Sequence, residues 1–77
     1  MKKYDKFFEK ERILYVVAVV KNDKYEASLH MGIMQGYKEA LFDTGVDFEK
    51  ICDLHDRIMT AIDFAYRMER RYRKARK

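Results

Sequence analysis

The residues best suited to chemistry in this 77-residue chain are one cysteine and two histidines. In the run CDLH, Cys52 and His55 stand three positions apart on an expected helix, a spacing at which two side chains can hold one metal ion. His30 would have to supply a third ligand, and the sequence contains no second cysteine and no Glu-x-x-His pair. We therefore predict no metal site, and we interpret Cys52 as a small buried thiol and His55 as a partly buried imidazole.

A second candidate for chemistry is a row of acidic residues with helical spacing, namely Glu49, Asp53, Asp56 and Asp63. Paired carboxylates can transfer protons or hold a divalent ion, but only where a cleft removes them from water. This row is expected to lie opposite the apolar side of its helix, so we interpret it as a solvated face. The sequence has no phosphate-binding loop, no dinucleotide fingerprint and no plausible Ser/His/Asp arrangement, and we predict that the protein is not an enzyme and needs no cofactor.

The third candidate is the basic end MERRYRKARK, in which six of ten residues are Lys or Arg. Its cations alternate with apolar positions as on one side of a helix, and the predicted partner-binding residues are Met68, Tyr72, Arg67, Arg70, Arg71, Arg73 and Lys74. Cations in the last turns of a helix stabilise its dipole by about 0.3–1 kcal/mol each, which alone would explain the run. An acidic protein partner and a nucleic acid remain open as alternatives, although no nucleic-acid-reading motif accompanies the charge.

The element that carries all three candidates is an expected long helix over about 47–75. Apolar residues repeat along it with heptad spacing and form what we call the core seam: Ile51, Leu54, Ile58, Ala61, Ala65, Met68, Tyr72 and Ala75. Apolar or weakly polar residues widen it on one side and form what we call the second stripe: Phe48, Cys52, His55, Met59, Ile62 and Tyr66. Thr44 or Asp47 is expected to cap the helix, and Asp53–Arg57, Asp63–Arg67 and Glu69–Arg73 to form i,i+4 ion pairs.

Two further helices are expected, over about 4–21 and 24–43. The second begins with the capping-box spacing of Asp23 and Glu26 and ends at Gly45. A β-hairpin over about 12–33, packed on two helices, competes with this prediction because ILYVVAVV is rich in β-branched residues and residues 25–33 alternate. The strong helix formers of YKEALF favour the helices. We therefore predict an all-α, three-helix domain in which ILYVVAVV is buried on nearly every side.

Length sets how these helices can pack. At about 1.5 Å per residue the third helix exceeds 40 Å, whereas the other two reach about 25–30 Å. The shorter helices would lie antiparallel on its first half, leaving Met68, Tyr72 and Ala75 beyond the bundle. Since burying such side chains is worth about 1.5–3 kcal/mol apiece, we expect a homo-oligomer, most simply a dimer. Gly32 and Gly36 each cost about 1 kcal/mol in a helix, which predicts a close approach there, by the first helix or by another protomer.

Composition bounds the class of protein. Seventy-seven residues, three Gly, no Pro and 48% hydrophobic residues fit a single domain over 1–77. The net charge of +4 hides a basic, acidic, basic order along the chain, which suits pairing between chains as well as internal neutralisation. A single cysteine suits a reducing compartment, and the longest apolar run is far shorter than the roughly 20 residues of a membrane span. We expect a cytoplasmic protein that does not enter the membrane.

The run GIMQGYKEALFDTGVDFEKICDLHDRI resembles small all-helical accessory proteins of phages and mobile elements, with a short helical hairpin, a glycine stop and an acidic helix start. The resemblance implies a protein that acts by binding, as a modulator or inhibitor of a host protein, and it carries no functional residue across. Together with the absence of catalytic motifs it favours a protein-protein interaction module. The alternative is a nucleic-acid-binding module that uses the basic C-terminal helix.

Overall fold

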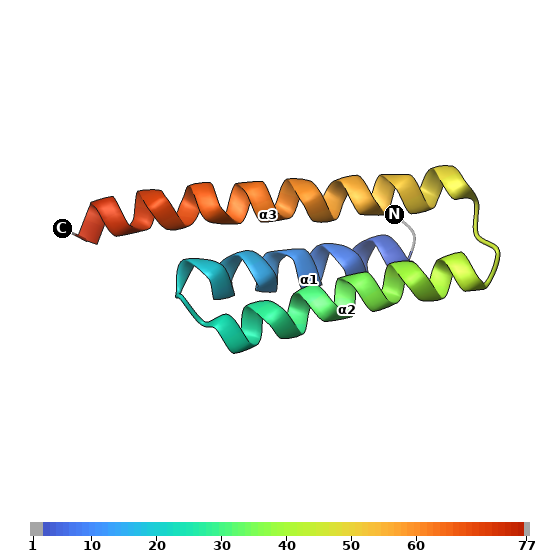
Figure 1. Cartoon of the computed structure of the whole chain (residues 1–77), viewed down its shortest axis with the longest axis horizontal. Helices are drawn as coiled ribbons and strands as arrows, with labels where there is room; N and C mark the ends of the chain where they lie inside the picture. Colours follow the sequence, from blue (N-terminus) through green and yellow to red (C-terminus); the bar gives the residue numbers. More distant parts are fainter. Residues whose placement is uncertain (1–2, 77) are drawn as a thin grey trace.

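A computed structural model describes residues 3–76 of the chain, with the side chains of residues 6–75. It consists of three helices, α1 (Lys3–Val20), α2 (Lys24–Asp43) and α3 (Phe48–Arg76), joined by two short turns (Figure 1). The predicted all-α fold with a long C-terminal helix is confirmed. The described residues contain no strand, so the alternative of a β-hairpin over 12–33 is wrong. The β-branched run of α1 is helical because its neighbours in the bundle bury one side of it, which outweighs its modest intrinsic preference for a strand.

The turn between α1 and α2 is stabilised by two of its own residues, Asn22 and Asp23. Asn22 adopts a left-handed conformation with φ of 61°, which an asparagine tolerates better than most residues. Its N–H donates to the Val19 carbonyl at 3.0 Å, and the Asp23 N–H donates to the Ala18 carbonyl at 2.8 Å. Asp23 then caps α2, because its carboxylate accepts the Glu26 N–H at 3.0 Å. The Asp23 half of the expected capping box is confirmed.

The turn between α2 and α3 repeats this ending with a glycine. Gly45 has φ of +80°, and the N–H groups of Gly45 and Val46 both donate back to carbonyls of the last turn of α2. Thr44 does not cap α3, since its hydroxyl donates to a carbonyl of α2 at 2.9 Å. Asp47 caps α3, accepting the Glu49 N–H at 3.1 Å. Of the two caps proposed from sequence, the second is therefore the one used.

The hydrophobic core lies between the three helices, and the core seam of α3 forms one side of it. The seam is buried from Ile51 to Ala65, as its heptad spacing predicted. The residues that complete this core are Phe8, Tyr15, Ala18 and Val19 of α1 and Met34 of α2. No helix of the described residues is both long enough and apolar enough to cross a membrane.

The packing of the helices differs from the sequence-based prediction in direction and extent. α1 runs parallel to α3, and only α2 is antiparallel to it (Figure 1). The α1–α2 turn reaches as far along α3 as Glu69 and Arg73, which line a pocket with Val19 and Asn22. The bundle therefore covers much more than the first half of α3. Only the last turns of α3 extend beyond it (Figure 1).

Two predictions about burial are wrong. The apolar run of α1 is not buried on nearly every side, since Ile13 is 51% exposed and Leu14 and Val17 are also exposed. Helical spacing places these residues opposite the core face of α1, where neither α2 nor α3 lies. Gly32 and Gly36 make no close approach to α1, because a Cβ at either position would meet no atom within 4 Å. Both glycines are exposed, and Gly32 borders a hollow that Tyr66 of α3 also lines. The alternative of a contact with another protomer stays a prediction.

Candidate interaction surfaces

The basic end of α3 is helical, and its outer side is exposed to solvent. Arg67 pairs with Asp63 at 3.2 Å and Arg73 with Glu69 at 2.5 Å, so two of the expected i,i+4 ion pairs hold here. The third expected pair, Asp53–Arg57, is also present, at 3.1 Å. These pairs neutralise Arg57, Arg67 and Arg73 locally.

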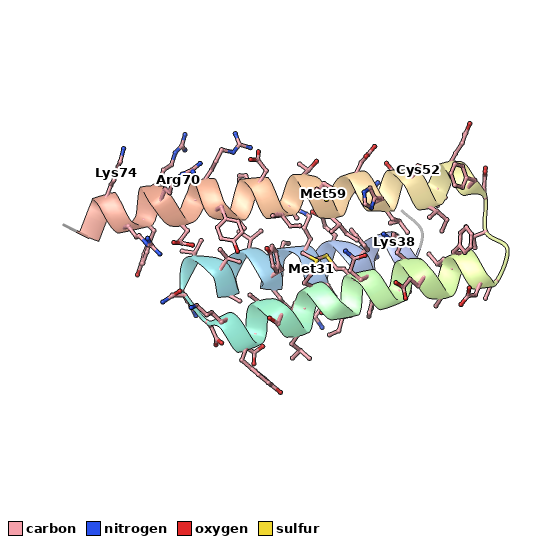
Figure 2. The ribbon with its side chains drawn as sticks, viewed as in Figure 1. Met31, Lys38, Cys52, Met59, Arg70 and Lys74 are labelled. Atoms are coloured by element: carbon pink, nitrogen blue, oxygen red, sulfur yellow. The ribbon has the colours of Figure 1, made fainter. Side chains whose placement is uncertain are left out.

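Arg70, Arg71 and Lys74 are exposed and make no ion pair with any side chain that the structure describes. Arg70 and Lys74 point away from α1 and α2, on the side of α3 that faces solvent (Figure 2). These cations keep their full charge available to a partner. Surface pairs such as Arg67–Asp63 add little to stability, in the range of about 0–1 kcal/mol.

The two apolar members of the predicted binding set do not share one environment. Met68 is partly buried, because the bundle extends further along α3 than expected. Tyr72 is 45% exposed and Ala75 is exposed, so the core seam leaves the bundle near Tyr72 rather than at Met68. The structure thus divides the predicted binding set: Arg70 and Lys74 point to solvent, Arg73 faces the α1–α2 turn, and Met68 is partly buried.

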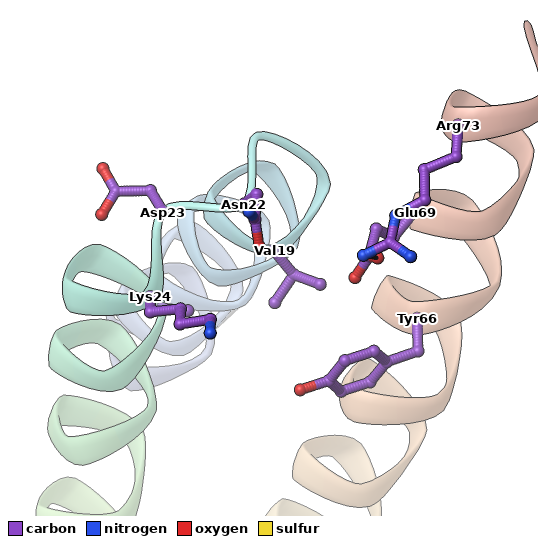
Figure 3. A pocket seen from close by; sticks show the side chains of 8 residues that line it. Val19, Asn22, Asp23, Lys24, Tyr66, Glu69 and Arg73 are labelled. Atoms are coloured by element: carbon purple, nitrogen blue, oxygen red, sulfur yellow. Dashed lines mark ion pairs between the residues drawn. The ribbon is translucent and has the colours of Figure 1, made fainter. Parts of the chain in front are cut away.

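A pocket of about 260 Å³ lies where the α1–α2 turn meets α3 (Figure 3). Its lining combines the apolar Val19 and Ala27, the turn residues Asn22, Asp23 and Lys24, and Tyr66, Glu69 and Arg73 of α3. Figure 3 shows the Glu69–Arg73 ion pair facing Val19 across the opening. The charges of the pocket are mixed, with two carboxylates and two cations, so it has no preference for an anion or a cation as a whole.

The second stripe of α3 leaves several large apolar side chains exposed along one helix. Phe48 is 68% exposed, Met59 53% and Tyr66 51%, and Ile62 is partly buried. The sequence placed these residues beside the core seam, where they were expected to widen a buried side. The structure leaves three of them exposed beside α2, where His55 contacts Lys38 and Tyr66 lines a hollow with Met31, whereas Ile62 packs against the core.

The groove between α2 and α3 contains two further hollows beside the pocket at the turn. One, of about 390 Å³, lies between Tyr66 on α3 and the α2 residues Met31 and Gly32, with Tyr15 at its base. The other, of about 300 Å³, lies near the opposite end of the bundle, between Lys38 and Phe42 of α2 and Ile51 of α3. Of the second stripe, Tyr66 lines the first of these hollows and the pocket at the turn, whereas the core-seam residue Ile51 lines the other hollow.

One tyrosine of this groove has an altered acidity. Burial raises the pKa of the Tyr15 phenol above its ordinary value of 10.0, and the nearby Tyr66 raises it further. On the other side of α1, the hydrogen bond from Arg12 lowers the pKa of the Glu9 carboxyl below its ordinary 4.5. That pair joins neighbouring turns of one helix and stays partly exposed.

A buried charged cluster between α1 and α2 was not anticipated. Glu11 is only 7% exposed, and its carboxylate lies 2.6 Å from Nδ1 of His30. Nε2 of the same ring lies 3.2 Å from the Glu26 carboxylate. The His30 ring thus bridges a carboxylate of α1 and a carboxylate of α2. The sequence does contain a sign of this cluster, because Glu11 lies on the same side of α1 as the core residues Phe8 and Tyr15. A carboxylate buried at such a position requires a partner.

The residues considered for metal binding lie apart. Cys52 is exposed, so its interpretation as a buried thiol is wrong. His55 is exposed too, and its Nδ1 lies 3.2 Å from Nζ of Lys38. His30 belongs to the cluster between α1 and α2. Among the described residues no three His, Cys, Asp or Glu side chains gather as a set of metal ligands.

The acidic row of α3 is largely a paired, solvated face. Asp53 pairs with Arg57 and Asp63 with Arg67, and both acids are exposed. Glu49 and Asp56 are exposed and make no ion pair with a described side chain. Asp56 borders an open hollow of about 340 Å³ with Glu9, Arg12 and Arg57. Glu49 and Asp56, like the unpaired cations at the other end of α3, are exposed to a partner.

Comparisons with known proteins identify no relative of this chain. No protein-family model matches the chain, and no curated protein and no solved structure matches it significantly. The resemblance to small accessory proteins of phages and mobile elements stays a prediction.

Proposed function

We propose that the protein is an interaction module that acts by docking to another protein chain. The observation that carries the proposal is the exposure of large apolar side chains in ordered rows, rather than singly, on two helices. One row is the outer side of α1, with Ile13, Leu14 and Val17, and the other is the second stripe of α3, with Met59 and Tyr66. Grouped apolar side chains on a surface mark sites where a partner removes them from water.

Self-association through α3 is the first mode of docking that we propose. α3 is acidic in its first half and basic in its second, and both halves hold charges that no described side chain pairs. Two such helices are complementary when they run antiparallel, which favours one orientation of a homodimer.

Light scattering on the intact chain tests this proposal. We expect a mass of twice 9.4 kDa at micromolar concentrations, falling towards 9.4 kDa on dilution. A mass of 9.4 kDa at every accessible concentration would contradict self-association. A host protein as a further target, as the phage resemblance implies, would use the outer side of α1, and substitution of Val17 by Asp should then abolish binding without changing the mass of the dimer.

A second candidate function rests on the unpaired cations Arg70, Arg71 and Lys74. Their common exposure at the end of α3 is what a nucleic-acid phosphate backbone would require. Binding of duplex or single-stranded nucleic acid at low salt, with an affinity that falls steeply as salt rises, would support this role. Unchanged mobility of both kinds of nucleic acid at low salt would dismiss it.

A further inference from the structure

We propose that the second stripe of α3 pairs with the second stripe of another copy, with the two helices antiparallel and a two-fold axis between Met59 and Ile62. This inference rests on the proposed self-association and deepens it by naming the surface and the register. It also replaces the core seam, which sequence alone indicated as the contact. The core seam is covered by the bundle up to Ala65, and only its end near Tyr72 is open.

The spacing of the second stripe is that of a helix that packs against another helix. From Phe48 its members recur at alternating intervals of four and three, through Cys52, His55, Met59, Ile62 and Tyr66, and the same intervals continue to Glu69 and Arg73. This is the heptad pattern of a coiled-coil seam. α3 therefore carries two neighbouring seams. Its bundle covers the first as far as Ala65 and the second only in part, at Ile62 and Glu69.

An antiparallel register fits the stripe onto itself. When Met59 faces Ile62 of the second copy, His55 faces Tyr66 of the second copy, and each of these contacts occurs twice by symmetry. One heptad step further, Cys52 meets Glu69 and Phe48 meets Arg73. The two central layers thus join members of the second stripe, whereas the outer layers set Cys52 and Phe48 against Glu69 and Arg73, which pair with each other within one chain at 2.5 Å. Each contact occurs twice, as an isologous two-fold interface requires. Three of the large side chains of the stripe, at 51–68% exposure, would be covered together.

Charge decides the orientation. In this register Glu49 lies beside Arg70 of the second copy on the outer edge of the stripe, and neither residue has an ion pair among the described side chains of its own chain. Asp56 lies beside Asp63 of the second copy, whose charge Arg67 already offsets at 3.2 Å. A parallel arrangement would set the basic ends against each other, and like charges across an interface are unfavourable.

The groove beside the stripe leaves room for the second helix. The hollow of about 390 Å³ next to Tyr66 is bordered on α2 by Met31 and by Gly32, where no atom lies within 4 Å of a Cβ position. The helix of a second copy that lies along the stripe would enter this space, and α2 of each chain would flank the pair. The dimer would then bury the open side of the α2–α3 groove in both chains.

Disulfide trapping in the full-length chain tests the register. The variant Cys52→Ser/His55→Cys/Tyr66→Cys replaces two exposed residues, and the two new thiols face each other only between chains, because the same helix holds them several turns apart. Mild oxidation should convert it to a covalent dimer linked twice. The matched control Cys52→Ser/Thr60→Cys/Arg71→Cys carries thiols with the same separation at exposed positions outside the second stripe. It should form no covalent dimer under the same oxidation.

The outcomes separate this inference from the proposed function. A native chain of dimeric mass whose His55→Cys/Tyr66→Cys variant cross-links, while the control does not, supports the register. A dimeric mass without this cross-link would contradict the second stripe as the interface and leave self-association standing. Cross-linking of the variant Cys52→Ser/Tyr72→Cys instead would do the same. A monomeric mass overturns both. In addition, Met59→Asp should raise the dissociation constant of the dimer by roughly 100-fold, because the side chain enters the interface twice.

Discussion

Removing His30 should expose how strongly the α1–α2 interface depends on one buried charge. In the native chain the Glu11 carboxylate, 7% exposed, lies 2.6 Å from the His30 ring. The change His30→Leu fills a similar volume but leaves the carboxylate without a partner. Breaking a buried ionic pair in this way costs about 3–5 kcal/mol. Domains of this length unfold with about 4–12 kcal/mol in total, so the variant should lose a large fraction of its stability.

The double variant Glu11→Leu/His30→Leu separates the cost of the unpaired charge from the value of the pair. Replacing both partners by apolar residues removes the uncompensated carboxylate, and such exchanges are often neutral or stabilising by about 1–4 kcal/mol. We therefore expect the double variant to be more stable than His30→Leu and close to the native chain. Glu26→Gln serves as the control, since that carboxylate is partly exposed and its loss should cost no more than about 1 kcal/mol.

Urea unfolding followed by circular dichroism measures all four proteins on one scale, with equal slopes required for the comparison. The reasoning is refuted if His30→Leu loses less than about 1 kcal/mol, or if the double variant is no more stable than His30→Leu. Either result would mean that the Glu11 carboxylate finds solvent when its partner is gone.

Three further outcomes follow from the fold. Burial, and then Tyr66, raises the pKa of Tyr15 above 10.0 in the folded chain. The stability that this shift contributes is therefore complete below pH 10 and is lost as the pH rises through the folded-state pKa. Tyr15→Phe should reduce this alkaline loss of stability, followed by circular dichroism in a pH titration. Gly36→Ala should raise the free energy of unfolding by about 1 kcal/mol, since the added Cβ meets no atom within 4 Å; a decrease in denaturant unfolding would show an unrecognised contact at this site. Asp23→Ala should lower that free energy by about 1 kcal/mol through loss of the α2 cap, whereas Asp23→Asn should retain most of it, and equal losses in both variants would show that the cap is not the cause.

The helices and their ends could be predicted from the sequence because their causes are local. Asp23 and Gly45 set the ends of α2 by capping and by a left-handed turn, and both effects depend only on neighbouring residues. The core seam could be predicted as far as Ala65 because a heptad repeat fixes which side of a helix is apolar. The i,i+4 ion pairs follow from the same geometry.

What the sequence could not supply depends on how the helices lie against one another. Periodicity shows that Met59 and Ile58 are both on the broad apolar side of α3, but only the positions of α1 and α2 decide that Ile58 is buried and Met59 exposed. The direction of α1 and the reach of its turn to Arg73 likewise decide that Met68 is partly covered. The Glu11–His30 pair joins residues far apart in the chain, so spacing within one helix gives no sign of the partner.

The central claim is that α3 docks through its second stripe, and sedimentation equilibrium on two single variants tests it most directly. Met59→Asp places a charge within the stripe, and Thr60→Asp places the same charge one residue away, at an exposed position outside the stripe that borders α1. We expect the native chain and Thr60→Asp to sediment at twice 9.4 kDa, and Met59→Asp to sediment at 9.4 kDa with an unchanged helical spectrum. Equal masses for the two variants, whether both dimeric or both monomeric, would contradict docking through the second stripe.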